Sequence, residues 1–213
     1  MNSVKYEEVS GYVEDFVGDG GSLLAWAYAK SLELGPEGVV PVDPPRGRFL
    51  ELTARMARPK RILEIGSGAG YSALWFLKGA SQTARLDVVE VNPTVAKEFE
   101  RVMTRAGYRK RIRIHRGPAL EVLPRLKGLY DCVFIDADKD EYPDYLRHAL
   151  RLTHPGSIII ADNMFWGGSV LGDKQREGAR RIHEYTRMIF KEKRLSSILI
   201  PLGDGLALSH RIK

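Results

Sequence analysis

From Lys60 onward the chain alternates short apolar segments with amphipathic ones, and this alternation limits its possible folds more than any other feature. Strand-like segments that are each followed by a helical segment predict an open parallel sheet with helices on both faces, since parallel strands need a long crossover connection. The predicted strands are Arg61–Ile65, Leu86–Val91, Arg111–His115, Tyr130–Ile135 and Ser157–Ala161. The predicted helices are Tyr71–Leu77, Thr94–Ala106, Ala119–Leu126, Tyr142–Leu152 and Gln175–Phe190.

Two further apolar segments, Ser197–Pro201 and Gly205–His210, lie near the end of the sequence. Only Leu202, Gly203 and Asp204 separate them, and a parallel crossover does not fit into so short a connection. The pair is therefore predicted to form an antiparallel hairpin. A Rossmann-like sheet that ends in such a hairpin differs from the sheet of a plain dehydrogenase.

The first 45 residues precede this alternation, and we interpret them as an N-terminal helical extension of a single domain that spans residues 1–213. Two helices are predicted, Val4–Val17 and Ser22–Leu34, with the glycine-rich segment Gly18–Gly21 as the break between them. A Gly- and Pro-rich loop and an amphipathic helix, Arg46–Ala57, connect the extension to the first strand.

Composition excludes several classes of protein. The chain has 213 residues, of which 44% are hydrophobic and 28% charged, which is typical of a globular protein and not of a disordered or collagen-like one. No apolar run approaches the roughly 20 residues of a membrane span, and the acidic N-terminus does not resemble a signal peptide. We expect a soluble, cytoplasmic protein, and the high arginine content is typical of a thermophile. The single cysteine, Cys132, lies in an apolar segment and is predicted to be a buried thiol.

The segment Glu64–Gly70 connects the first predicted strand to its helix. Its glycines allow a sharp turn and a close approach of the backbone to a ligand. The spacing is GxGxG, whereas dinucleotide-binding proteins have GxGxxG, and Tyr71 stands where the third glycine would be. Glu90 ends the second strand, where a carboxylate can accept hydrogen bonds from both ribose hydroxyls. Together these residues favour nucleoside binding over a plain tight turn.

Oxygen-bearing side chains follow the fourth and fifth predicted strands. Asp136 and Lys139 come after the fourth strand, and Asp162 and Asn163 after the fifth. Because ligands of open α/β sheets bind beyond the carboxyl ends of the strands, these side chains are expected to converge. Two carboxylates and an amide suit Mg²⁺, Ca²⁺ or Mn²⁺. The alternative is that these acids are solvated or cap the helices that follow.

Taken in order, these motifs resemble those of the divalent-metal-dependent class I S-adenosylmethionine O-methyltransferases, the caffeoyl-CoA and catechol O-methyltransferase group of bacterial and archaeal type. The resemblance covers roughly residues 36 to 213. It implies an α/β, Rossmann-like methyltransferase fold with a seven-stranded, mostly parallel sheet of order 3-2-1-4-5-7-6. It rests on Leu63–Ser72, Val89–Glu90, Gly117–Leu120, Phe134–Lys139, Asp162–Asn163 with Trp166, and Pro201–Gly205.

The resemblance also implies roles for individual residues. Asp136, Asp162 and Asn163 resemble the ligands of one divalent cation, with Mg²⁺ favoured over Ca²⁺ and Mn²⁺, and Asp136 and Lys139 resemble the catalytic pair, with Lys139 as general base. The implied contacts of the cofactor S-adenosylmethionine are Val42, Glu64, Gly66, Ser67, Gly68, Ser72, Glu90, Pro118, Ala119, Asp136, Asp138 and Tyr145.

The implied reaction is methylation of a hydroxyl of a small vicinal-diol aromatic, catechol- or caffeoyl-like. Val42 and Gly167 stand where plant members carry threonine and asparagine, so a plant-like caffeoyl-CoA pocket is not expected. The N-terminal helices, residues 4–34, are expected to cover the acceptor site or to pack across a homodimer interface.

Two other functions stay open. Some bacterial relatives resemble tRNA hydroxyuridine methyltransferases, and the net charge of +6 permits an RNA partner. Basic stretches at residues 109–116 and 176–187 could form an RNA footprint, although a solvated basic face is the favoured interpretation. The third reading is a cofactor-binding module without methyl transfer, against which the intact Asp136, Lys139, Asp162 and Asn163 argue.

Overall fold

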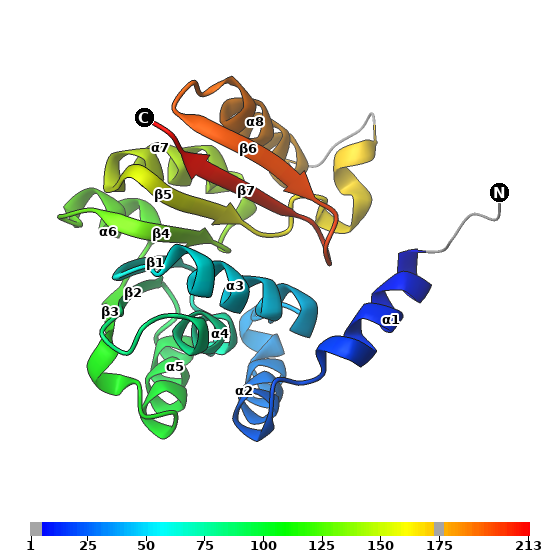
Figure 1. The fold of residues 1–213 in the computed structure, drawn as a ribbon, viewed down its shortest axis with the longest axis vertical. Helices are drawn as coiled ribbons and strands as arrows, with labels where there is room; N and C mark the ends of the chain where they lie inside the picture. Colours follow the sequence, from blue (N-terminus) through cyan, green and yellow to red (C-terminus); the bar gives the residue numbers. More distant parts are fainter. Residues whose placement is uncertain (1–5, 173–176) are drawn as a thin grey trace.

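The computed structural model describes residues 6–172 and 177–213, which form a seven-stranded sheet with helices on both faces (Figure 1). The strand order is β3-β2-β1-β4-β5-β7-β6, as the resemblance implies. The strands are β1 (Arg61–Ile65), β2 (Arg85–Glu90), β3 (Ile112–Arg116), β4 (Tyr130–Ile135), β5 (Thr153–Ala161), β6 (Leu195–Ile200) and β7 (Leu206–Arg211).

Strand pairing determines which strand ends lie together at one edge of the sheet. The first five strands pair in parallel, and Ile65 is in register with Val89 of β2 and with Ile135 of β4. The carboxyl ends of β1, β2 and β4 therefore lie at one edge. β7 pairs antiparallel with both β5 and β6, so the predicted hairpin is confirmed.

Alternate strand residues face two separate apolar clusters, because successive side chains of a strand point to opposite faces. Ile62 and Phe134 belong to one cluster, Leu63 and Val133 to the other. The first cluster is covered by α2 (Ser22–Glu33), α3 (Pro44–Ala57), α4 (Tyr71–Gly79) and α5 (Pro93–Arg105). The second is covered by α6 (Ala119–Val122), α7 (Tyr142–Leu152) and α8 (Glu177–Lys191). Cys132 is a buried free thiol of β4, as predicted.

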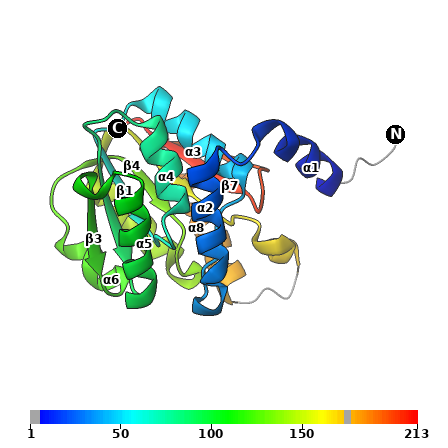
Figure 2. The same ribbon diagram turned by 90° about the horizontal axis from the view of Figure 1, so that it is seen from below.

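The first helix, α1 (Tyr6–Val17), projects away from the sheet and its covering helices in both views (Figures 1 and 2). Its aromatic side chains Tyr12 and Phe16 are exposed. Val4 and Lys5 of the first predicted helix, and residues 175 and 176 of the last, lie outside the described residues. No helix in the described part of the chain has both the length and the apolarity to cross a membrane.

The start of α3 differs from the sequence prediction in a way that matters for the site. The helix begins at Pro44, two positions before the predicted Arg46, because the Asp43 side chain accepts a hydrogen bond from the Arg46 N–H at 2.8 Å. Proline is tolerated in the first turn, where its missing N–H has no helical partner. The side chain of Arg46 is thereby fixed in the first turn of α3.

The other boundaries shift by a few residues. The predicted helical segment 119–126 is divided into α6 and a 3₁₀ turn, Leu123–Arg125, that contains Pro124. β5 starts at Thr153, four residues before the predicted start, because Thr153 pairs with Tyr130 across an irregularity in the register.

Candidate functional site

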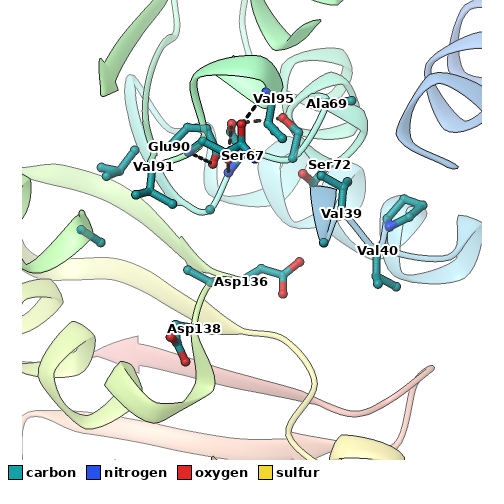
Figure 3. A pocket seen from close by; sticks show the side chains of 18 of the residues that line it. Val39, Val40, Ser67, Ala69, Ser72, Glu90, Val91, Val95, Asp136 and Asp138 are labelled. Atoms are coloured by element: carbon teal, nitrogen blue, oxygen red, sulfur yellow. Dashed lines mark hydrogen bonds between the residues drawn. The ribbon is translucent and has the colours of Figure 1, made fainter. Parts of the chain in front are cut away.

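A cavity of about 810 Å³ lies at the carboxyl edge of the parallel strands. Its walls come from the turn after β1, the ends of β2, β3 and β4, the loop after β5, and the N-terminal segment 37–42. Figure 3 shows Ser67 and Glu90 on one side of this cavity, and Asp136 and Asp138 across from them. The predicted site residues that line it are Val42, Gly66, Ser67, Gly68, Ser72, Glu90, Pro118, Ala119, Asp136, Asp138, Lys139, Tyr145 and Asn163.

The turn after β1 brings the backbone close to the end of β4. Gly66 has a φ of +86°, and a Cβ atom there would lie 2.2 Å from the carbonyl oxygen of Asp136. A side chain at this position would therefore clash with the backbone of the neighbouring strand end. The glycine accounts for how the ends of β1 and β4 can form one wall of the cavity.

Glu90 is held by donors from its own strand end and from the glycine turn. Ser67 donates to its Oε2 through the backbone N–H at 3.2 Å and through the hydroxyl at 3.1 Å, and the Asn92 N–H donates to Oε1 at 2.9 Å (Figure 3). Glu37 of the N-terminal segment accepts a hydrogen bond from the Asn92 side chain at 2.8 Å. The carboxylate is thus fixed at the cavity wall, and the N-terminal segment is fastened beside it.

Glu64, unlike the other predicted cofactor contacts, does not line the cavity. Its side chain is fully buried, its Oε1 accepts a hydrogen bond from the Ser72 hydroxyl, and its Oε2 has no hydrogen-bond partner among the described residues. Burial raises the pKa of Glu64 to about 8, from an ordinary value of 4.5. The unpaired oxygen is suited to pair with a positively charged group.

On the other side of the cavity, Lys139 joins the end of β4 to α7. Its Nζ donates to Asp136 Oδ1 at 2.9 Å and to the Tyr142 hydroxyl at 2.8 Å, and Tyr142 in turn donates to the backbone oxygen of Asp162 at 2.9 Å. Burial raises the pKa of Tyr142 well above its ordinary value, so its hydroxyl stays a donor. The lysine is therefore positioned at the cavity wall between the ends of β4 and β5.

The sequence predicted that Asp162 would face the cavity, but in the structure it does not line it. It is 1% exposed, and both of its oxygens accept hydrogen bonds from Nη1 of Arg46, at 2.8 and 2.7 Å. Burial and the neighbouring charge of Asp136 raise the pKa of Asp162 to about 6, while Arg46 acts in the opposite direction. Asp136 and Asp162 therefore lie close enough to repel each other, although Asp162 faces Arg46.

Asn163, which does line the cavity, is held by the hairpin turn between β6 and β7. Its Nδ2 donates to Asp204 Oδ2 at 3.2 Å, and the Gly167 N–H donates to Asp204 Oδ1 at 2.7 Å. The backbone oxygens of Asp204 and Gly205 accept hydrogen bonds from residues 165 and 164. The amide nitrogen of Asn163 is thus directed to Asp204, and its amide oxygen faces away from that carboxylate.

The donor set suits a hard divalent cation. Within residues 6–172 and 177–213, no three His, Cys, Asp or Glu side chains are grouped to hold a metal ion. The predicted set has two carboxylates and one amide oxygen, which is the ligand chemistry that Mg²⁺ and Ca²⁺ accept. Asp136 and Asn163 line the cavity, Asp162 is buried, and the oxygens of these three side chains fit such an ion on chemical grounds.

Sequence reasoning missed Arg46 and Asp204 as residues of the site. The sequence pattern places Asp204 in the hairpin turn and Arg46 at the start of a helix, and indicates no role for either in the site. One local signal did exist for Arg46, because a cation is unfavourable in the first turn of a helix. Its presence there indicates that something outside the helix holds it.

Comparison with known proteins assigns a family to this arrangement. Residues 30–212 match the family described as O-methyltransferase. A catechol O-methyltransferase of Niastella koreensis is 37% identical over 191 residues, which are 86% of each chain. The O-methyltransferase TomG of Streptomyces achromogenes, involved in tomaymycin synthesis and solved with SAM, is 27% identical over 100% of both chains, with a TM-score of 0.86. A Bacillus cereus O-methyltransferase solved with SAH is 28% identical, with a TM-score of 0.84, over 96% of this chain and 97% of that one.

Proposed function

Because the chain belongs to the O-methyltransferase family, we propose that it transfers the methyl group of S-adenosylmethionine to a hydroxyl of a small vicinal-diol aromatic, with the help of one divalent cation. Cofactor-dependent O-methyl transfer is supported by the family match and by the cofactor-bound neighbours. The observation that carries the finer proposal is that Asp136 and Lys139 line the same cavity as the glycine turn and Glu90.

The cofactor half of the cavity suits S-adenosylmethionine, whose sulfonium makes its methyl carbon electrophilic. Glu90, held by three donors, presents a carboxylate to the ribose hydroxyls. Pro118 and Ala119 line the cavity where the adenine would lie. The unpaired Oε2 of Glu64 suits the ammonium group of the methionine end.

The acceptor half supplies groups that can activate and orient a hydroxyl. A divalent cation held by Asp136, Asp162 and Asn163 would supply Lewis acidity to an acceptor phenol, whose ordinary pKa is about 10. In its neutral amine form, Lys139 Nζ, which lies between Asp136 and Tyr142, can take the proton of the acceptor hydroxyl. Trp166 lines the cavity near Asn163 and offers an apolar wall to an aromatic ring.

The charge of the cavity favours a small acceptor over tRNA. Among the described residues that line it, six are acidic and Lys139 is the cation; the acids are Glu37, Glu90, Asp136, Asp138, Glu141 and Asp204. Phosphate groups would meet repulsion there. Arginines of the basic stretches pair with acids, as Arg109 does with Glu100 and Arg181 with Asp144. Arg176 lies outside the described residues.

Two parts of the N-terminal segment have separate roles: one forms the cavity wall, and the other is an interface between two copies of the chain. Residues 37–42 form part of the cavity wall, on the side where the cofactor would bind. The exposed aromatic face of α1, with Tyr12 and Phe16, is suited to an interface between two copies of the chain. A homodimer in light scattering that dissociates when the chain is shortened before Gly35 would support this part.

The experiment that tests the function is a methyl-transfer assay over a panel of acceptors. The full chain and labelled S-adenosylmethionine are incubated with a catechol, with the matching monophenol, or with tRNA that lacks the modification. We expect transfer to the catechol, little to the monophenol, none to the tRNA, and loss of more than about a hundredfold when EDTA is added. Binding of S-adenosylhomocysteine in EDTA serves as the control for intact protein.

Each part of the proposal has an outcome that contradicts it. Transfer to tRNA alone would replace the small acceptor by RNA. Full activity towards the catechol in excess EDTA would remove the cation from the mechanism and leave Lys139 and the positioning of the acceptor as the catalytic devices.

A further inference from the structure

Arg46 is a buried cation in direct contact with a predicted metal ligand. Its side chain is 9% exposed, and its Nη1 bridges both oxygens of Asp162, 116 residues away in the sequence. Its Nε donates to Asp43 Oδ2 at 3.1 Å. The guanidinium therefore joins the first turn of α3 to the end of β5, and it takes the position on Asp162 that a bidentate cation would take.

The surrounding fold accommodates this arginine at a local cost. A positive charge in the first turn of a helix opposes the helix dipole, so α3 itself does not favour it. The hairpin turn passes directly over the pair: a Cβ atom at Gly203 would lie 2.5 Å from both Arg46 Nε and Asp43 Oδ2. Helix, strand end and hairpin thus meet around one guanidinium, which indicates that the charge has a function in the site.

Lys139 pairs with Asp136 at 2.9 Å, and Arg46 pairs with Asp162 at 2.7 Å, so both carboxylates of the predicted donor set already have a cationic partner. A divalent cation that approaches Asp162 must share the carboxylate with Arg46 and is repelled by the guanidinium. Within a buried site this repulsion is strong, because little solvent screens it.

We propose that Arg46 sets the affinity of this site for divalent cations, as a built-in positive charge that holds Asp162 in place and keeps cation binding weak. The proposal rests on the function proposed above, since it concerns the cation that assists methyl transfer. The fold then does not depend on a bound metal ion, and the cation is retained best when acceptor oxygens add further ligands.

Replacement of the charge tests the proposal by direct binding. Mn²⁺ titrations, followed by the electron paramagnetic resonance of the free ion, are made on the metal-stripped full chain as wild type, Arg46→Gln and Arg46→Lys. We expect Arg46→Gln to bind Mn²⁺ at least about tenfold more tightly than wild type. Arg46→Lys, which keeps the charge, should stay within about threefold of wild type.

A second substitution tests whether the tighter Mn²⁺ binding of Arg46→Gln occurs at the predicted site. In the double variant Arg46→Gln with Asp162→Asn, the tighter binding should disappear, because the carboxylate that Arg46 had shielded is gone. Arg46→Met, which introduces an uncharged side chain of similar length, is the control for a folding defect that is specific to glutamine. Both uncharged variants should also unfold at a lower temperature in EDTA and recover when Mn²⁺ is added, a response that the wild type should show much less.

Two results would overturn the proposal: Mn²⁺ binding by Arg46→Gln and Arg46→Met that is no tighter than that of wild type, or a gain that persists in the double variant. The proposed function is tested separately, by wild-type turnover in EDTA. A wild type that needs no metal but whose Arg46→Gln variant gains a cation site would remove the cation from the reaction and still support the role of Arg46.

Discussion

The two halves of the cavity are built in different ways. The cofactor half is made by short chain segments whose contacts are mostly local or come from the backbone: Glu90 accepts hydrogen bonds from Ser67, 23 residues away, and from Asn92, two residues away. The acceptor half is assembled by side-chain pairs between distant segments. Arg46 reaches Asp162 across 116 residues of sequence, and Asn163 reaches Asp204 across 41.

This difference has an energetic consequence. Glu90 has neutral donors, so its charge stays available to a ligand. Asp162 has a buried guanidinium, and removal of one member of such a pair leaves an uncompensated buried charge, which costs about 3–5 kcal/mol. Removal of Glu90 should therefore act mainly on cofactor binding, whereas changes in the acceptor half affect chemistry, charge balance and stability together.

The largest effect on turnover should come from Lys139→Ala. We expect kcat to fall about a hundredfold at neutral pH, because the acceptor hydroxyl loses the group that takes its proton. The loss should shrink at high pH, where a phenol ionises unaided. Stopped assays across pH, with saturating cofactor, measure this. Lys30→Ala, which removes a lysine from a surface pair of the same spacing, is the control. A loss that is constant with pH would show that Lys139 only supports the wall of the cavity.

Glu90→Ala should give the next largest effect, confined to the cofactor. Loss of charge-assisted contacts to the ribose should weaken binding by roughly 1.5–3 kcal/mol for each hydrogen bond lost. Calorimetric titration with S-adenosylhomocysteine measures the affinity, and kcat at saturating cofactor should change little. Glu100→Ala, which removes a half-buried acid of α5 that is paired with Arg109, is the matched control. Unchanged affinity in Glu90→Ala would mean that Glu90 is a solvated strand end, and the contrast between the two halves would weaken.

The smallest effect concerns Glu64 and appears as a dependence of stability on pH. Its folded-state pKa of about 8 lies above its ordinary value of 4.5, so the folded protein holds this proton more tightly than the unfolded chain. The stability that this proton contributes is complete below about pH 4.5 and is lost as the pH rises towards 8. Glu64→Gln cannot lose a proton, so its free energy of unfolding relative to wild type should rise over this range, by at least about 1 kcal/mol at pH 8.

Urea unfolding of the cofactor-free protein at several pH values measures this difference. A difference in free energy of unfolding between Glu64→Gln and wild type that stays constant from pH 5 to pH 8 would show that Glu64 is ionised in the free protein. Cofactor affinity gives a second check. Because the cofactor ammonium favours the ionised carboxylate, wild-type affinity should increase as the pH approaches 8, and Glu64→Gln should remove that increase.

Local pattern was enough to predict the parallel strands, the closing hairpin, the glycine turn and the position of Glu90, whereas the order of the strands and the other cofactor contacts were implied by the family resemblance. The strands are short apolar segments, and the glycines of the Glu64–Gly70 turn have positive φ angles, so these features are recorded in neighbouring residues. The predicted role of Glu90 follows from its position at the end of β2. The correct placement of Asp136, Lys139 and Asn163 at the cavity came from the rule that such sheets bind ligands at the carboxyl ends of their strands.

What the sequence by itself determined is the set of chemical groups at this edge: a glycine turn, two carboxylates, an amide and a lysine, brought together by the order of the parallel strands. The tertiary structure decided which of them face the cavity and which are paired. Asp162 is buried against Arg46, Asn163 is held by Asp204, and Glu64 lies behind the turn with one oxygen unpaired. No local pattern could record those pairings, because each depends on the packing of a helix or a hairpin from a distant part of the chain.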